Sequence, residues 1–204
     1  TLIPRDPIIA VVLVALFLLG LIVHNVAQAR AAARLGDESA LGAGFGTVRP
    51  DIHVGLDASV WYLLLGLGLP RRVPIRLRGR PAALALLAGP LATIVFALLV
   101  AVLQRLLQPL VPGPDVVYDG MRRAVGLLLL HAVFFLLPLP TLDGGRALRE
   151  VGPRGIRSAL REHRMVGSLL LYILWVVLWI SNVAPAVLRA LLIGTQALTS
   201  WLPV

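Results

Sequence analysis

Long apolar segments alternate along this chain with short connections that contain arginine and proline. The first apolar segment covers about residues 7–35, where Pro7 can open a helix and Gly36-Asp37 can close it. The second begins at Pro81 and ends near Leu107. Three shorter apolar segments follow, at residues 122–138, 165–180 and 184–202. The pattern predicts an all-α polytopic membrane protein with about five spans.

The connection between the two longest segments has a different composition. Residues 36–57 contain five Gly and several polar residues, which favours short strands or a loop. The mostly apolar residues 58–69 are too few to cross a bilayer and suit a re-entrant or interfacial segment. We therefore expect a re-entrant or small β element near residues 44–69. Residues 146–164, with six Arg among apolar residues, are expected to lie along the membrane surface.

The distribution of arginine predicts the topology. Residues 30–80 hold 8 and residues 146–164 hold 6 of the 19 basic residues, whereas the connection at residues 105–123 holds three. Because basic connections favour the cytoplasmic side, this distribution predicts an outside N-terminus in the cytoplasmic membrane. It also predicts that His24 and Asp143 lie at the cytoplasmic ends of neighbouring spans.

The composition excludes several classes of protein. With 58% hydrophobic and 14% charged residues, the chain is too apolar for a soluble domain of 204 residues. It has no Cys, so disulfides and thiolate zinc sites are excluded. The net charge of +9 is concentrated in the connections, and we expect no nucleic-acid partner. We expect one transmembrane domain over residues 1–204, whose first helix is retained rather than cleaved as a signal peptide.

The sequence His24-Asn25-Val26-Ala27-Gln28 near the end of the first apolar segment has the spacing of a zinc-protease helix. In an H-E-x-x-H helix the two His bind zinc from one face and the Glu transfers protons. Here Asn25 stands at the Glu position and Gln28 at the second His position. Asn25 cannot act as a general base, because its amide has no useful pKa. Gln28 offers a neutral oxygen, which is a poor replacement for imidazole on zinc.

Three sequence landmarks together resemble the site-2 protease family of intramembrane zinc metalloproteases, in its compact bacterial form. The first is the HNVAQ segment, which is followed by Arg34-Leu35-Gly36-Asp37; the second is Ala88-Gly89-Pro90-Leu91-Ala92, similar to AGPLAN with Thr93 in place of Asn. The third is residues 137–146, LPLPTLDGGR, similar to NLLPxPPLDGG. Arg49-Pro50 with His53 is a weaker match to NPxxH. The resemblance covers about residues 8–150, with residues 165–204 as additional C-terminal spans.

The resemblance implies which residues would form the site. It makes Asp143 the third zinc ligand beside His24, and it marks a degenerate site made of His24, Asn25, Gln28 and Asp143. Thr93 and Phe135 stand where the family would have polar amides. The resemblance also implies helix contacts at a further set of positions: Gly89, Pro90, Thr93, Pro138 and Pro140.

Other roles for these residues remain open at this point. His24 could be hydrogen-bonded inside the bundle rather than ligating metal. Asp143 could cap the helix that begins at Gly144 by accepting backbone N–H bonds, or it could pair with His24 in a network that includes Gln28 and Asn25. His53 could supply a replacement ligand or could simply be solvated. For His131 we expect a hydrogen bond between helices.

These observations favour a catalytically inactive site-2-protease-like membrane protein. It would serve as a binding or structural module for other transmembrane helices, for example as an accessory subunit of a larger membrane complex. We expect the bilayer and other transmembrane proteins as partners and no cofactor. The alternative is an active or weakly active intramembrane zinc metalloprotease, through unusual ligands or as the inactivated form of an active parent. A channel or transporter is disfavoured, because the sequence has no internal repeat.

Overall fold

The computed structural model describes residues 6–55, 60, 62, 64–110, 115–162 and 168–201, and within these the regular structure is entirely helical. The longer helices are α1 (Pro7–Arg34), α5 (Gly79–Leu107), α6 (Val116–Leu136), α9 (Ser168–Ile180) and α10 (Val183–Thr199). The shorter helices are α2 (Ser39–Gly42), α3 (Pro50–His53), η1 (Gln108–Leu110), α7 (Asp143–Val151) and α8 (Arg154–Glu162). The predicted all-α class is confirmed.

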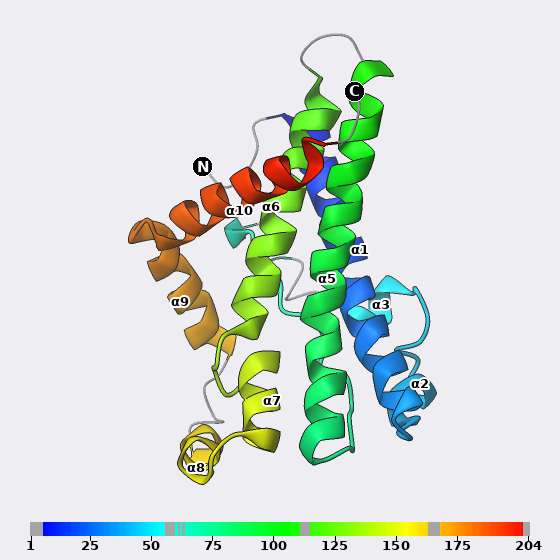
Figure 1. Ribbon diagram of the computed structural model, residues 1–204, viewed down its shortest axis with the longest axis vertical. Coiled ribbons are helices and arrows are strands. Elements are labelled where there is room, and N and C mark those ends of the chain that lie inside the picture. The colour runs from blue at the N-terminus through cyan, green and yellow to red at the C-terminus, as the bar shows by residue number, and fades with distance from the viewer. Residues whose placement is uncertain are drawn as a thin grey trace.

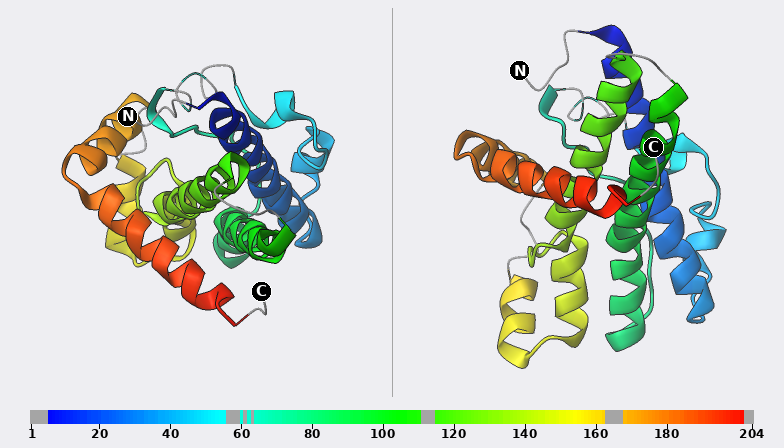
Figure 2. Two further views of the ribbon diagram at one scale, coloured as in Figure 1. Left: turned by 90° about the horizontal axis from the view of Figure 1, so that it is seen from above. Right: turned by 45° about the horizontal axis from the view of Figure 1, so that its top comes forward.

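Helices α1, α5 and α6 form the centre of the molecule and run side by side (Figure 1, Figure 2). Between α5 and α6 the core contains Ala97, Val100, Val125 and Leu128, among other apolar side chains. Helix α7 continues below α6 and packs on the start of α5, where Ala147 meets Ala83 and Leu86 in a second apolar cluster. This packing fixes the start of α7 beside the middle of α1 and α5.

Two aspartates and one glycine set the ends of α1 and the start of α6. Asp6 caps α1, since its Oδ1 accepts hydrogen bonds from Ile8 N at 2.8 Å and Ile9 N at 3.3 Å. Gly36 ends α1 with φ of 95°, as a left-handed residue does after many helices. Asp115 caps α6 in the same way as Asp6, and α6 therefore begins before residue 122, where the apolar pattern placed its start.

The structure does not confirm the predicted five spans. Among the described residues, α1 and the segment Gly79–Leu110 are long and apolar enough to cross a membrane. The α9–α10 pair adds at most one span, because it bends by 74° at its break. Helix α6 has 21 residues but carries Asp119, Arg122 and Arg123 near its start. Two or three helices can therefore span a bilayer, which agrees with an integral membrane protein, and five spans are not confirmed.

The connection at residues 36–57 is helical where strands or a loop were expected. It contains α2 and α3, and the described part of the chain has no strand. Pro50 sits in the first turn of α3, where its missing N–H costs nothing. The expected re-entrant element is not confirmed; residues 56–59, 61 and 63 lie outside the described part. Residues 67–78 are extended without sheet pairing. The segment expected to lie along the membrane surface contains two helices, α7 and α8, which are separated at Gly152-Pro153.

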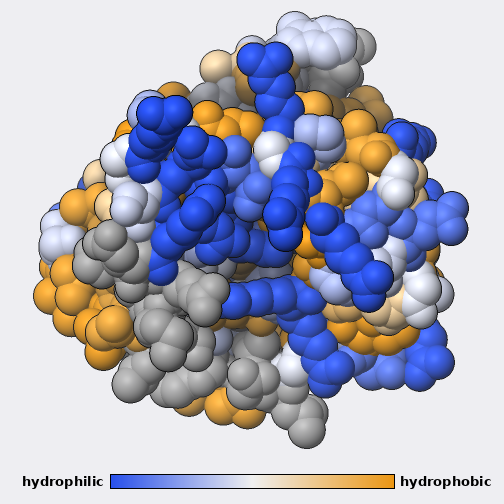
Figure 3. All heavy atoms as spheres, turned by 90° about the horizontal axis from the view of Figure 1, so that it is seen from below, coloured by the Kyte–Doolittle hydropathy of each residue, from blue (hydrophilic) through white to orange (hydrophobic). Residues whose placement is uncertain are grey.

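Hydrophilic side chains gather at the end of the bundle where α1 finishes and α5 begins (Figure 3). Exposed arginines occur in both heavily basic connections, among them Arg34, Arg78, Arg80 and Arg154. This grouping is the structural counterpart of the uneven arginine count. Which side of the membrane this end faces stays a prediction.

Candidate functional site

Helices α1 and α7 bring the imidazole of His24 against the carboxylate of Asp143. His24 Nε2 lies 2.8 Å from Asp143 Oδ2, and the two residues are 3% and 5% exposed. Gln28 follows His24 by one turn of α1, so both side chains leave the same face. The Gln28 Nε2 atom is 3.3 Å from His24 Nε2. These three residues form one buried group, which we call the His24 cluster: His24, Gln28 and Asp143.

Gly89 allows α5 to approach the His24 cluster. A Cβ atom at residue 89 would lie 2.6 Å from His24 Nε2 and 2.7 Å from Gln28 Nε2, closer than real Cβ contacts. Any side chain here would therefore displace the cluster or separate the helices. The AGP landmark thus has a physical explanation, because its glycine supplies the room that the polar side chains of α1 occupy.

Pro90 accounts for the position of the Gln28 amide. Proline has no backbone N–H, so within a helix the carbonyl four residues earlier lacks its usual donor. For Pro90 that carbonyl belongs to Leu86, and Gln28 Nε2 donates to Leu86 O at 2.9 Å. Gln28, only 1% exposed, therefore satisfies a backbone group that the helix itself leaves open. An interior proline four residues after a carbonyl is a sequence signal that could have revealed this partner.

The second ring nitrogen of His24 faces Thr93 on α5. His24 Nδ1 lies 3.3 Å from Thr93 Oγ1, which in turn donates to Gly89 O at 3.1 Å. Because the Thr93 hydrogen is used there, we assign the Nδ1 hydrogen as the donor to Thr93. Nε2 is then the nitrogen that faces Asp143. It is also the nitrogen that a metal would require.

Asp143 does not cap α7, and that expectation was wrong. The residue before the helix is Leu142, and no side chain makes a cap hydrogen bond there. Asp143 instead turns toward α1, and its second oxygen, Oδ1, accepts a hydrogen bond from Arg146 Nη1 at 3.0 Å. The carboxylate thus has a partner on each oxygen. Arg146 was not predicted as a site residue, although its position one turn after Asp143 would have suggested the pair.

Asn25 lies outside the His24 cluster and donates hydrogen bonds to two backbone carbonyls. Its Nδ2 donates to Arg71 O at 3.1 Å and to His53 O at 3.4 Å, and the residue is 1% exposed. The Arg71 N–H also donates to His53 O, at 2.8 Å. The amide therefore joins α1 to the end of α3 and to the extended segment 67–78. A carboxylate at this position would meet two carbonyl oxygens instead of donating to them.

Two further histidines differ from their expected roles. His53 is not solvated but completely buried, and its Nε2 is 2.7 Å from Thr47 O. It contributes its backbone carbonyl, not its ring, to the contact with Asn25. His131 bonds through Nδ1 to Leu127 O of its own helix at 3.1 Å, so the hydrogen bond expected between helices is wrong. Its ring packs beside Phe17 and Trp175.

The donor atoms of the His24 cluster do not fit a hydrolytic zinc site. Such a site has three protein ligands and an open position for water. The cluster offers one imidazole, one carboxylate already bonded to Arg146, and one neutral amide bonded to Leu86. No group of three or more His, Cys, Asp or Glu side chains that could hold a metal occurs in the part of the chain that the structure describes.

The helical fold agrees with an integral membrane protein and is consistent with a site-2-protease-like class. The chain is similar to a protein of Bacillus subtilis (strain 168) named "Putative zinc metalloprotease YwhC". The two are 27% identical over 177 residues, which cover 80% of each chain. No protein-family model matches the chain. No solved structure matches it either.

Proposed function

We propose that this chain is a catalytically inactive relative of the intramembrane zinc metalloproteases. In this proposal it keeps the helical framework of the protease and uses it to bind other transmembrane helices, as a structural module or accessory subunit of a membrane complex. The proposal concerns the role of the framework, since the chemistry of the site has been replaced by contacts that hold the chain together.

The hydrogen bonding of Asn25 carries this proposal. At the position where a protease needs a general base, a buried amide donates to two backbone carbonyls, of His53 and Arg71. These bonds require N–H donors and could not be made by a carboxylate. The residue that departs from the motif is therefore built into the fold. Loss of a general base alone costs on the order of 10²- to 10⁴-fold in rate.

Gln28 supports the same interpretation independently. Its amide donates to the Leu86 carbonyl that Pro90 leaves without a helical donor. Both departures from H-E-x-x-H thus have structural partners in this chain.

A face of α5 is suited to contact another helix within the membrane. Leu84, Leu91, Val95 and Leu99 are between 55% and 62% exposed, and they lie on the helix whose other face packs on α1 and α6. Lipid chains can cover such a face, and so can a partner helix. The proposal assigns it to a partner helix.

Purification of the tagged chain in a mild detergent tests this assignment. We expect a transmembrane companion at fixed stoichiometry, which is lost in Leu91→Trp on α5. The matched control is Leu19→Trp, a half-exposed apolar position on α1. A chain that migrates alone, or a companion lost equally from both variants, would contradict the α5 assignment.

An active or weakly active zinc metalloprotease is the second candidate. One observation in its favour is that His24 Nε2 and Asp143 Oδ2 lie 2.8 Å apart. A second is the similarity to the protein named "Putative zinc metalloprotease YwhC". This candidate requires tight zinc binding by an unusual donor set. Cleavage of a transmembrane substrate that stops in Asp143→Ala would favour it over the inactive module.

A further inference from the structure

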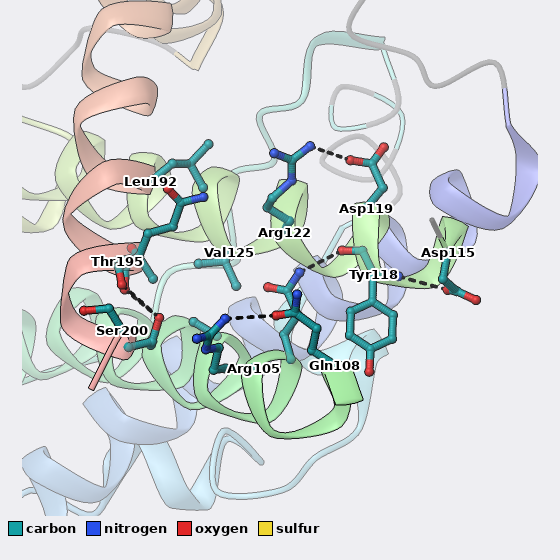
Figure 4. Close-up of a pocket in the computed structure, with 14 residues that line it drawn as sticks. Arg105, Gln108, Asp115, Tyr118, Asp119, Arg122, Val125, Leu192, Thr195 and Ser200 are labelled. Carbon is teal, nitrogen blue, oxygen red and sulfur yellow. Dashed lines mark hydrogen bonds and ion pairs between the residues drawn. The ribbon is translucent and has the colours of Figure 1, made fainter. Parts of the chain in front are cut away.

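A pocket of about 700 Å³ lies between the end of α5, the start of α6, and α10 (Figure 4). Its first lining residue on α5 is Ala101, twelve positions after Gly89. At 1.5 Å per helical residue, this separates the pocket from the His24 cluster by roughly 18 Å or more. The pocket is therefore distinct from the site described above.

The pocket has an apolar floor and a polar rim. Ala101, Val125 and Leu192 contribute apolar surface from three different helices. Thr195, Thr199 and Ser200 contribute hydroxyl oxygens from the C-terminal end of α10 and the residue after it. A cavity with these two kinds of surface is complementary to an amphiphile, whose polar and apolar parts would contact the rim and the floor.

The charges around the rim leave one guanidinium with unused donors. Arg122 pairs with Asp119 at 2.9 Å, and Asp115 accepts from the first backbone N–H groups of α6. Arg105 donates from Nη1 to the amide oxygen of Gln108 at 3.2 Å, and no carboxylate pairs with it in the described part of the chain. Its Nε is buried and has no hydrogen-bond partner there. A buried guanidinium N–H without an acceptor is costly and calls for an anionic ligand.

The charge balance limits the ligand to a small anion. Two arginines and two aspartates line the pocket, so a polyphosphate would meet as much negative charge as positive charge. A phosphodiester carries a single negative charge and matches the guanidinium of Arg105, which has no carboxylate partner among the described residues and whose planar N–H groups suit phosphate oxygens.

The surroundings of the pocket indicate where the anion comes from. Arg105 lies near the end of Gly79–Leu110, one of the helices able to cross a membrane. Leu103, Leu106 and Leu198 are each about half exposed or more on the helices that line the pocket. Such apolar surface beside a polar pocket at the end of a span is expected at the level of lipid headgroups. We infer that this pocket binds the phosphate headgroup of one membrane phospholipid, held by Arg105.

Binding of defined lipids to the delipidated protein in maltoside detergent tests this inference. The probe is palmitoyl-oleoyl phosphatidylglycerol, and the comparison lipid is a diacylglycerol with the same chains, which lacks the phosphate. Native mass spectrometry counts the lipids per chain. We expect one phosphatidylglycerol per chain and about tenfold weaker binding in Arg105→Gln, since a charge-assisted bond is lost. Diacylglycerol should not be retained.

Two further variants separate this site from general effects. Gln196→Trp, at an exposed position on the rim, should block the pocket without changing its charge. Arg189→Gln is the matched control, because Arg189 is exposed on α10 and does not line the pocket. Equal loss of lipid in Arg189→Gln, or unchanged binding in both Arg105→Gln and Gln196→Trp, would overturn the inference. So would inorganic phosphate that competes fully at equal concentration, since the ligand would then be free phosphate.

Discussion

The middle of the helical bundle and the pocket at one of its ends differ in whether their buried polar groups have partners. At the His24 cluster, the side chains of His24, Gln28 and Asp143 have partners at short distance, and Gly89 leaves just the room they need. At the pocket of α5, α6 and α10, which has a volume of about 700 Å³, Arg105 Nε is buried and has no hydrogen-bond partner among the residues that the structure describes. The region around His24, Asn25 and Gln28 is filled, whereas the region without a motif holds a pocket.

Glycine substitutions should show the largest difference in stability between these two regions. A Cβ at Gly145 would meet the backbone of Leu139, so Gly145→Ala should force α7 away and cost about 3 kcal/mol or more of the free energy of unfolding. Gly194, on the helix that lines the pocket, has nothing within 4 Å of an added Cβ. Gly194→Ala should be neutral or stabilising. Thermal unfolding in detergent measures both, and equal melting temperatures would contradict the difference.

The role of Asn25 predicts an unusual order of stabilities. Asn25→Glu restores the glutamate of H-E-x-x-H but places a carboxylate next to His53 O and Arg71 O. It should therefore reduce the free energy of unfolding by about 2–3 kcal/mol. Asn25→Ala removes the two bonds without adding charge and should cost about 1 kcal/mol. Denaturation of the two variants side by side measures this order. A Glu variant as stable as the native chain would remove the main support for an inactive site.

The pairing of Gln28 with the carbonyl freed by Pro90 predicts coupling between these two residues. Gln28→Ala should leave Leu86 O unsatisfied, whereas Pro90→Ala supplies the missing helical N–H. In the double variant the loss from Gln28→Ala should shrink by about 1 kcal/mol. A double-mutant cycle of unfolding free energies measures the coupling, and strictly additive effects would show that Gln28 is held for another reason.

The smallest effect is expected at Asp37, outside the spans. The Ser39 hydroxyl and the Arg76 backbone N–H hold the pKa of Asp37 below its ordinary value. A carboxyl with a lowered folded-state pKa stabilises the fold above its unfolded pKa of about 4, and this contribution disappears as the pH falls through the folded pKa.

Asp37→Asn should therefore reduce the free energy of unfolding at neutral pH by about 1 kcal/mol or less. The melting temperature should fall accordingly. The difference from the native chain should narrow as the pH drops below about 4. Glu38→Gln is the control, because Glu38 is exposed next to it. A difference that does not change with pH would show that the charge of Asp37 is not what stabilises this loop.

The sequence was informative where helix ends and landmarks coincide. Helix α1 was expected over residues 7–35 and covers Pro7–Arg34, because Asp6 and Gly36 close it locally. The approach of His24 to Asp143 followed from the order of three landmarks.

The rest depended on contacts between distant segments. The partners of Asn25 belong to residues 53 and 71, whose positions no local pattern specifies. The small strands or loop expected from five glycines are not confirmed, since glycine content is also compatible with the short helices α2 and α3. The five spans are not confirmed either, and apolar length alone does not reveal the bend of 74° between α9 and α10. The pocket around Arg105 has no sequence signature at all.

Zinc content per chain tests the central claim most directly. Protein purified without chelator, from medium supplied with zinc, should contain far less than one zinc per chain, because His24 and Asp143 are two ligands where three are needed. The variant Gln28→His supplies the third ligand and should raise the zinc content, which shows that the assay can detect a filled site. Near-stoichiometric zinc in the native chain, lost in both His24→Ala and Asp143→Ala, would contradict the account.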